Sequence, residues 1–211
     1  MDTYKETFRT WNKVASIYED KFMDLDLYND TYNFFTEQIP TNNPEILEIG
    51  CGPGNITKYV LGKRPDFKLT AIDIAPNMIK LAKKNNPNAT FKVLDIRNIT
   101  TIRQNFNGIL AGFCVPYLSQ MDCLKLIQDC RKLLSSSGIL YISFVEGIYE
   151  DSAYQIGSSG DRVFFYYHSL DFFKNIIETN HFTIIKLYHK NFDKTDKTTE
   201  THTIMIARKH Q

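Results

Sequence analysis

The feature that most constrains the fold is a short apolar run that ends in a glycine-rich turn and continues as a helical pattern. The run "EILEIG" is followed by Gly52 and Gly54, so that glycine occupies three alternate positions. Glycine after a buried strand lets the backbone turn sharply and approach a ligand, and the following helix points its free N–H groups at that ligand. The stretch therefore predicts a strand, a ligand-binding turn and a helix.

The same alternation of strand and helix continues towards the C-terminus. It predicts an α/β fold with a doubly wound, mostly parallel sheet covered by helices on both faces. The loop expected at residues 191–200 is long enough for a hairpin-like return, so the final strand can run antiparallel. After the glycine turn, strands are expected at residues 67–74, 89–96, 107–115, 138–145, 162–168, 182–190 and 201–209.

Composition narrows the function classes. The chain has 211 residues, 43% of them hydrophobic and 23% charged, which is typical of one main globular domain. No apolar run approaches the roughly 20 residues of a membrane span, and the N-terminal residues do not resemble a signal peptide, so we expect a cytoplasmic protein. The net charge of +1 predicts neither a nucleic-acid nor a membrane partner. The four cysteines lack zinc-site spacing, so we expect free thiols and no metal.

The glycine spacing departs from the dinucleotide fingerprint G-x-G-x-x-G, because Asn55 stands where the third glycine is required. Glu48 lies two residues before the first glycine, at the end of the strand. A carboxylate there would repel a pyrophosphate but suits a ligand with an ammonium group. The turn therefore favours a ligand that is cationic nearby.

The next two strands also end in acids. Asp73 ends the second strand, where a carboxylate can accept both hydroxyls of a ribose. Asp95 ends the third, where it could accept a hydrogen bond from an adenine amine while Ile74 and Ile96 offer apolar faces to the ring. Taken alone, Glu48 could equally be a partner of a helix N-terminus, and Asp95 could equally be a solvated strand end.

Together these motifs resemble the class I, Rossmann-like S-adenosylmethionine-dependent methyltransferases, over roughly residues 11–208. The resemblance implies a seven-stranded sheet with an antiparallel last strand, a helical lid at residues 1–40 and a catalytic domain at residues 41–211. It implies S-adenosylmethionine as cofactor and S-adenosylhomocysteine as product. The cofactor-binding residues expected from it are Glu48, Gly50, Cys51, Gly52, Gly54, Asn55, Asp73, Ile74, Met78, Asp95, Ile96 and Phe113.

The segment after the fourth strand bears on the substrate. Methyltransferases of this superfamily that act on nucleic acids or amide nitrogens often carry an Asn or Asp, two prolines and an aromatic residue there. This chain has Cys114, Val115, Pro116 and Tyr117, so the acid or amide and the first proline are missing. We therefore expect a small-molecule methyl acceptor.

Four residues are candidates for catalysis. Tyr117 is expected near the transferred methyl group, or alternatively as a packing aromatic, and Tyr18 is expected to close over the cofactor from an N-terminal helix. Glu146 and His168 are the candidate general bases, although His168 has the alternative of a structural role. The other aromatic residues of the N-terminal stripe, Phe8, Trp11 and Phe22, are expected to face the core.

Two other functions remain open at this stage. A module that binds S-adenosylmethionine or S-adenosylhomocysteine without catalysis would carry the same motifs. A nucleotide-dependent oxidoreductase is disfavoured by Glu48 and Asn55. The acceptor atom and the oligomeric state do not follow from the sequence.

Overall fold

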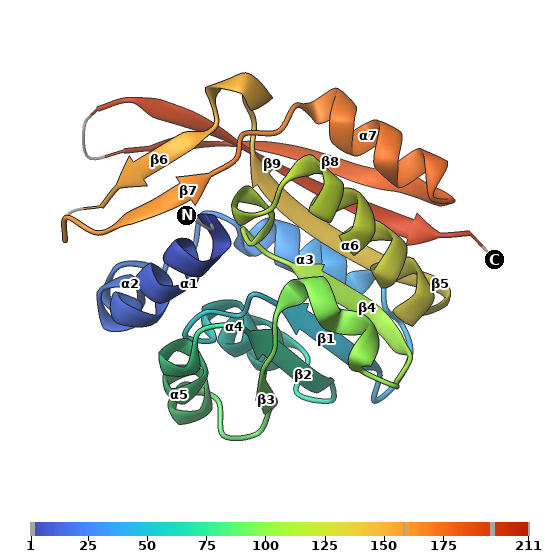
Figure 1. The fold of residues 1–211 in the computed structure, drawn as a ribbon. Coiled ribbons are helices and arrows are strands. Elements are labelled where there is room, and N and C mark those ends of the chain that lie inside the picture. Colours follow the sequence, from blue (N-terminus) through green and yellow to red (C-terminus); the bar gives the residue numbers. More distant parts are fainter. Residues whose placement is uncertain (1–2, 158, 195–196, 211) are drawn as a thin grey trace.

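A computed structural model describes residues 3–157, 159–194 and 197–210 of the chain (Figure 1). The α-helices are α1 (Thr3–Lys13), α2 (Ala15–Phe22), α3 (Asn29–Glu37), α4 (Asn55–Lys63), α5 (Pro76–Asn85), α6 (Gln120–Leu133) and α7 (Leu170–Thr179). The strands are β1 (Glu45–Ile49), β2 (Lys68–Asp73), β3 (Thr90–Val93), β4 (Phe106–Ala111), β5 (Leu134–Val145), β6 (Ala153–Ile156), β7 (Arg162–Phe165), β8 (Phe182–Asp193) and β9 (Thr199–Lys209). Short 3-10 helices are η1 (Ile96–Thr101), η2 (Val115–Tyr117) and η3 (Tyr149–Asp151).

Seven strands form one twisted sheet in the order β3-β2-β1-β4-β5-β9-β8. The first five pair in parallel, whereas β9 lies antiparallel between β5 and β8. The strand order reverses beside β1, and in open α/β sheets ligands bind outside the carboxyl ends of the strands at such a point. The expected fold class, including the antiparallel last strand, is confirmed.

The two faces of the sheet are buried under different helices. The first core cluster joins Ile49 and Ile109 of the sheet to Ile127 of α6 and Phe173 of α7. The second joins Ile46 on the opposite face to Phe35 of α3 and Val60 of α4. Figure 1 shows the resulting three layers. Because both faces are covered, a polar side chain on a central strand is buried unless it stands at a strand end.

Several expected elements differ in the structure. Strand β3 ends at Val93, so Asp95 does not end the strand as expected but caps η1. The strand predicted at residues 138–145 begins at Leu134, directly after α6, so the serine-rich stretch belongs to β5 and is bulged against β4. Strand β8 extends to Asp193 and β9 begins at Thr199, which shortens the loop predicted at residues 191–200. The strand predicted at residues 162–168 ends at Phe165 and pairs with β6 in a separate hairpin, which the polar residues before it did not indicate.

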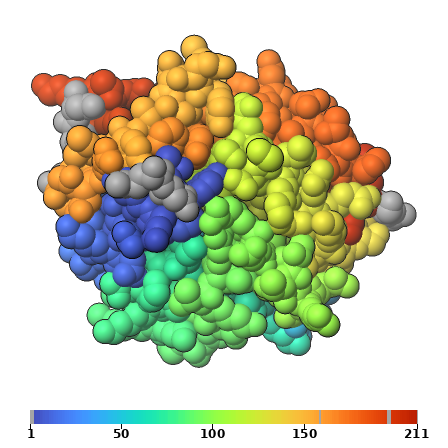
Figure 2. Space-filling view, viewed as in Figure 1, coloured from blue at the N-terminus to red at the C-terminus, as the bar shows by residue number. Residues whose placement is uncertain are grey.

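The N-terminal aromatic stripe forms two helices, α1 and α2, divided at Val14. They lie between the β6–β7 hairpin and α5, and Figure 2 shows their blue surface filling the space between the orange hairpin and the green segments below it. Thr7 accepts a hydrogen bond from the backbone N–H of Phe164 at 3.0 Å, and Asn12 accepts two hydrogen bonds of 2.8 Å from Asn77. Among the helices of the described residues, none is long and apolar enough to cross a membrane.

Candidate ligand site at the glycine turn

The turn after β1 needs glycine for different reasons at its three positions. Gly50, Gly52 and Gly54 have φ values of +69°, +53° and +85°, in the region that L-residues with side chains rarely adopt. A Cβ atom on Gly50 would lie 2.5 Å from the Cβ of Cys114, and one on Gly54 would lie 2.4 Å from the Nδ2 of Asn86. A Cβ on Gly52 would meet only Tyr18, at 3.6 Å. Gly52 is therefore the glycine that faces open space.

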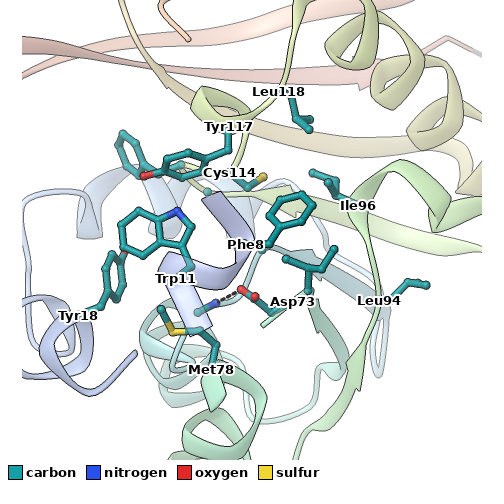
Figure 3. Close-up of a pocket in the computed structure, with 15 residues that line it drawn as sticks. Phe8, Trp11, Tyr18, Asp73, Met78, Leu94, Ile96, Cys114, Tyr117 and Leu118 are labelled. Atoms are coloured by element: carbon teal, nitrogen blue, oxygen red, sulfur yellow. Dashed lines mark hydrogen bonds between the residues drawn. The ribbon is translucent and has the colours of Figure 1, made fainter. Parts of the chain in front are cut away.

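Asp73 ends β2 beside this turn. Its Oδ2 accepts the backbone N–H of Gly52 at 2.9 Å, drawn as a dashed line in Figure 3, and its Oδ1 accepts the N–H of Ala75 at 2.8 Å. Burial raises the pKa of this carboxyl group, and the backbone N–H groups oppose the shift. A carboxylate has about four lone-pair directions, so these hydrogen bonds leave it acceptor capacity for a ligand.

A first cavity opens over the turn and encloses about 780 Å³ of free space, including its mouth. Of the expected cofactor-binding residues, those lining it are Gly50, Gly52, Asp73, Ile74, Met78, Ile96 and Phe113. Its remaining lining comes from Phe8, Trp11, Tyr18, Leu94, Gly112, Cys114, Tyr117 and Leu118.

Trp11 lies between Tyr18 and Tyr117 at the roof of this cavity (Figure 3). Its ring centroid is 5.5 Å from that of Tyr18 and 5.2 Å from that of Tyr117, both edge to face. The expectation that Phe8 and Trp11 face the core is wrong, because both line the cavity. The Trp11 indole N–H is buried and has no hydrogen-bond partner in the described part of the chain. Burial, followed by the charge of Asp73, raises the pKa of Tyr18 to about 12.

Glu48 lies beneath the turn, buried to 1% exposure, and lines neither cavity of this region. Its Oε2 accepts a hydrogen bond from Thr57 of α4, whereas its Oε1 has no partner among the described residues. Burial raises the pKa of Glu48 to about 8, with the Thr57 hydrogen bond opposing the shift and Asp73 adding to it. An acceptor atom that is buried without a partner costs about 1–3 kcal/mol, which a ligand's donor can recover.

Asp95 is held by a neighbour in the chain. Both carboxylate oxygens accept hydrogen bonds from the Arg97 side chain, and Oδ1 also caps the backbone N–H of Arg97 at 2.9 Å. The guanidinium of Arg97 in turn stacks on the ring of Tyr4, 4.4 Å from its centroid. The residues on either side, Leu94 and Ile96, line the first cavity, whereas Asp95 itself does not.

A second cavity adjoins the first and encloses about 910 Å³ of free space, including its mouth. The residues that line both cavities are Trp11, Tyr18, Gly50, Gly52, Gly112, Phe113 and Tyr117. Phe22, which was expected in the core, lines it, as do Cys51 and Asn55 from the turn. Phe113 stands at the boundary with a left-handed φ of +51°, and its N–H is bonded to the Ser143 hydroxyl at 2.8 Å. Non-glycine residues in this conformation cluster at ligand sites.

The two candidate bases lie outside both cavities. His168 is fully buried, with Nε2 3.3 Å from the carbonyl oxygen of Val115, and burial lowers its pKa to about 4. Glu146 accepts a hydrogen bond from Thr203 at 2.8 Å and lies 3.7 Å from the Nδ1 of His189. The structure therefore brings Tyr18 and Tyr117 to the shared wall but places neither His168 nor Glu146 there.

Three polar residues of the second cavity were missed from the sequence. Tyr28 precedes α3, and Glu200 and His202 lie two residues apart on β9, so that both face the cavity. The sequence held one signal for them: Glu200 and His202 stand at alternate positions just before the apolar run "TIMIA", so their side chains would share one face of a strand. Within the described ranges, no group of three or more His, Cys, Asp or Glu residues is arranged to hold a metal ion.

Comparison with known proteins agrees with this geometry. A family model described as "Methyltransferase domain" matches residues 46–138. The chain is 35% identical over 103 residues to malonyl-[acyl-carrier protein] O-methyltransferase of Acetivibrio thermocellus, which covers 47% of this chain and 35% of that protein. It is 24% identical over 143 residues to demethylmenaquinone methyltransferase of Thermotoga maritima, covering 66% and 62%. The matches thus span about a third to two thirds of these relatives' length.

Solved structures share the fold at low sequence identity. A SAM-dependent methyltransferase from Methanosarcina mazei superposes with a TM-score of 0.70 at 17% identity, over 82% of this chain and 96% of that one. The N-methyltransferase NodS from Bradyrhizobium japonicum, solved with S-adenosyl-l-homocysteine, gives a TM-score of 0.68 at 16% identity, over 98% and 100%. These likenesses support the fold, and the matched domain supports the resemblance drawn from the glycine turn.

Proposed function

Since this chain carries a methyltransferase domain on a Rossmann-like fold, we propose that it is an S-adenosylmethionine-dependent methyltransferase that acts on a small molecule. The observation that carries the proposal is the pair of adjoining cavities at the glycine turn. One is lined by an acid that ends β2, and the other is lined mainly by aromatic side chains, with Trp11, Tyr18, Phe113 and Tyr117 between them.

The first cavity fits an adenosyl ligand. Asp73 has acceptor capacity left for the ribose hydroxyls, and Ile74, Met78 and Ile96 offer apolar surface for the adenine ring. The positive φ values of the turn let its backbone approach the amino-acid end of the ligand, and Glu48, with its unpartnered Oε1, lies beneath that turn rather than in the cavity wall. When bound, S-adenosylmethionine supplies an electrophilic methyl group on a sulfonium.

The protein's part in such a transfer is to position the acceptor and exclude water. An in-line displacement gains much of its rate from a fixed, aligned approach of the acceptor atom, and a closed apolar site prevents competing reactions. The aromatic wall formed by Trp11, Tyr18 and Tyr117 comes partly from α1 and α2, which cover the turn. We therefore propose α1 and α2 as the lid of the site.

The presence of the second cavity favours an enzyme over a module that only binds the cofactor. A sensor needs the first cavity alone, whereas a methyl acceptor requires space on the other side of the shared wall. The second cavity supplies that space.

Calorimetric titration tests the proposal. S-adenosylmethionine and S-adenosylhomocysteine are expected to bind in competition with each other, whereas NAD is expected not to bind. Asp73→Ala should abolish most of the affinity, while Asp171→Ala, an exposed acid on the distant α7, should not change it. Binding of NAD alone would show that the site belongs to an oxidoreductase.

A further inference from the structure

His202 is the residue of the second cavity with the most unusual surroundings. It is 7% exposed, and its Nδ1 lies 2.6 Å from the Tyr28 hydroxyl oxygen. Its Nε2 is buried without a hydrogen-bond partner among the described residues and stands 3.6 Å from the Oε2 of Glu200. A buried nitrogen in this position invites a ligand group that can hydrogen-bond to it.

Two aromatic rings pack against the imidazole ring of His202. Phe192 of β8 stacks on it at 4.9 Å and 11°, and Phe113 contacts it at 5.0 Å. Because Phe113 also lines the first cavity, one side chain joins the proposed cofactor space to His202. The ring therefore cannot turn Nε2 away from the cavity without displacing two aromatic neighbours.

We propose that the second cavity binds a flat, uncharged acceptor with an acidic hydroxyl group, such as a phenol or an enol, and that His202 takes the hydroxyl proton. This assignment rests on the proposed methyltransferase function and names its acceptor class and its base. His202 replaces the two candidate bases suggested by the sequence, Glu146 and His168, because these residues line neither cavity.

The proposed class of methyl acceptor follows from the side chains that line the second cavity. No lysine or arginine lines it in the part of the chain that the structure describes, so a carboxylate or phosphate acceptor would find no cation there. The carboxylate that does line it, Glu200, is already paired with Lys194 at 3.0 Å, and it would repel an anion. Flat ring surface is supplied by Phe22, Tyr28, Tyr32, Phe113, Tyr117, Phe165 and Phe192.

The partners of His202 suit its protonated form. An imidazolium donates from both nitrogens, and here the Tyr28 oxygen can accept from Nδ1 while the Glu200 carboxylate lies on the side of Nε2. The neighbouring His202 and then Lys194 lower the pKa of Glu200, so its charge is present to stabilise the imidazolium. Burial raises the pKa of Tyr28, which keeps that hydroxyl neutral.

The step balances as a proton transfer coupled to a displacement. The O–H bond of the acceptor breaks and its proton forms an N–H bond at Nε2 of His202, while an oxygen lone pair forms the new O–C bond and the C–S pair remains on sulfur. The sulfonium charge is thereby replaced by the imidazolium charge, which Glu200 faces at 3.6 Å. The proton later leaves to solvent.

The test uses 4-nitrophenol, whose phenolate absorbs visible light, at a pH at which most of the free phenol is protonated. Mixing it with the full-length protein, with and without S-adenosylhomocysteine, should raise the phenolate absorption. His202→Gln should reduce this signal at least tenfold and lower the turnover of a phenolic acceptor by about 100-fold. His189→Gln, on the partly exposed side of β8, is the matched control and should leave the signal unchanged.

Two further arms make the outcome decisive. Glu200→Gln should weaken the phenolate signal, which provides a second reading if His202→Gln does not fold. The shape-matched 4-nitrobenzoate and 4-nitrobenzylamine should not displace the phenol. An equal signal in wild type and His202→Gln, or tighter binding of the benzoate or the amine, would overturn the assignment. If S-adenosylhomocysteine binds while nitrophenol gives no phenolate, the acceptor class is wrong and the methyltransferase proposal stands.

Discussion

The carboxylate of Asp73 and the backbone N–H of Gly52 are joined by a hydrogen bond of 2.9 Å, so the acid that ends β2 also holds the turn that ends β1. One side chain therefore shapes the backbone of the site and offers its remaining acceptor capacity to a ligand. Substitutions at this position should affect the ligand-free protein as well as its complex.

Replacing Asp73 with alanine should weaken S-adenosylhomocysteine binding by about 100-fold or more, because two hydrogen bonds to a charged acceptor are lost. The same change leaves the N–H groups of Gly52 and Ala75 without their acceptor, which should lower the free energy of unfolding by about 2 kcal/mol. Calorimetry and urea unfolding measure the two effects, with Asp171→Ala as control. Unchanged affinity would show that the carboxylate does not bind the ligand.

Glu48 should make the ligand-free protein less stable as the pH rises. Its pKa is about 8 in the folded state against an ordinary value of 4.5, so between these values the folded state binds more protons than the unfolded one. The free energy of unfolding should therefore fall from about pH 4.5 to about pH 8. Glu48→Gln, which can keep the Thr57 hydrogen bond, should flatten this slope in urea unfolding measured across that range.

Ligand binding gives an independent check on Glu48. If the ammonium group of the cofactor pairs with Glu48, binding near pH 7 should release a proton, which calorimetry in buffers of different ionisation enthalpy detects. Glu48→Gln should lose this release. Equal proton release by the two proteins would show that Glu48 does not face the ligand.

Substitutions of the turn glycines should separate effects on the free energy of unfolding from effects on ligand affinity. Gly54→Ala places a methyl group 2.4 Å from the Asn86 Nδ2, so we expect it to be the more destabilising of the two variants by about 1–3 kcal/mol. Gly52→Ala adds its methyl group to open cavity space beneath Tyr18. It should cost roughly 1–2 kcal/mol for its left-handed φ but lower ligand affinity strongly. Similar effects of both variants on binding would contradict this division.

Truncation should distinguish the lid from the core within the first forty residues. Helices α1 and α2 bury only Thr7 and Ala15, whereas α3 buries Tyr32 and Phe35 beneath the sheet. A protein without residues 1–22 should fold and lose turnover, and one without residues 1–40 should not fold. Circular dichroism and urea unfolding check this expectation, and intact activity after the shorter deletion would refute the lid.

The sequence correctly predicted the position of the glycine turn after β1 and of Asp73 at the end of β2, because both are local features of strands in a parallel sheet. It did not predict where Phe8 and Trp11 lie, since an amphipathic stripe looks the same whether it packs on a core or roofs a cavity. The sequence also did not predict the hydrogen bonds from the Arg97 side chain to Asp95, because they depend on the conformation of η1.

The second cavity was beyond sequence reasoning for a different reason. Tyr28 and His202 are 174 positions apart and meet only when β9 inserts between β5 and β8. No periodic pattern in the sequence indicates that Tyr28 and His202 contact each other. The left-handed φ of Phe113, which sets its ring between the cavities, is likewise a tertiary constraint.

The matched domain, residues 46–138, contains the turn and the acids Glu48, Asp73 and Asp95. It includes neither Trp11 and Tyr18 before it nor Glu200 and His202 after it. The segment by which this chain is recognised therefore supplies only part of the second cavity, and the segments on either side of it supply the rest. Two proteins could agree throughout that central segment and still methylate unrelated compounds. A prediction of substrate for any such chain should begin from the segments on either side of the matched domain, which here line one cavity together.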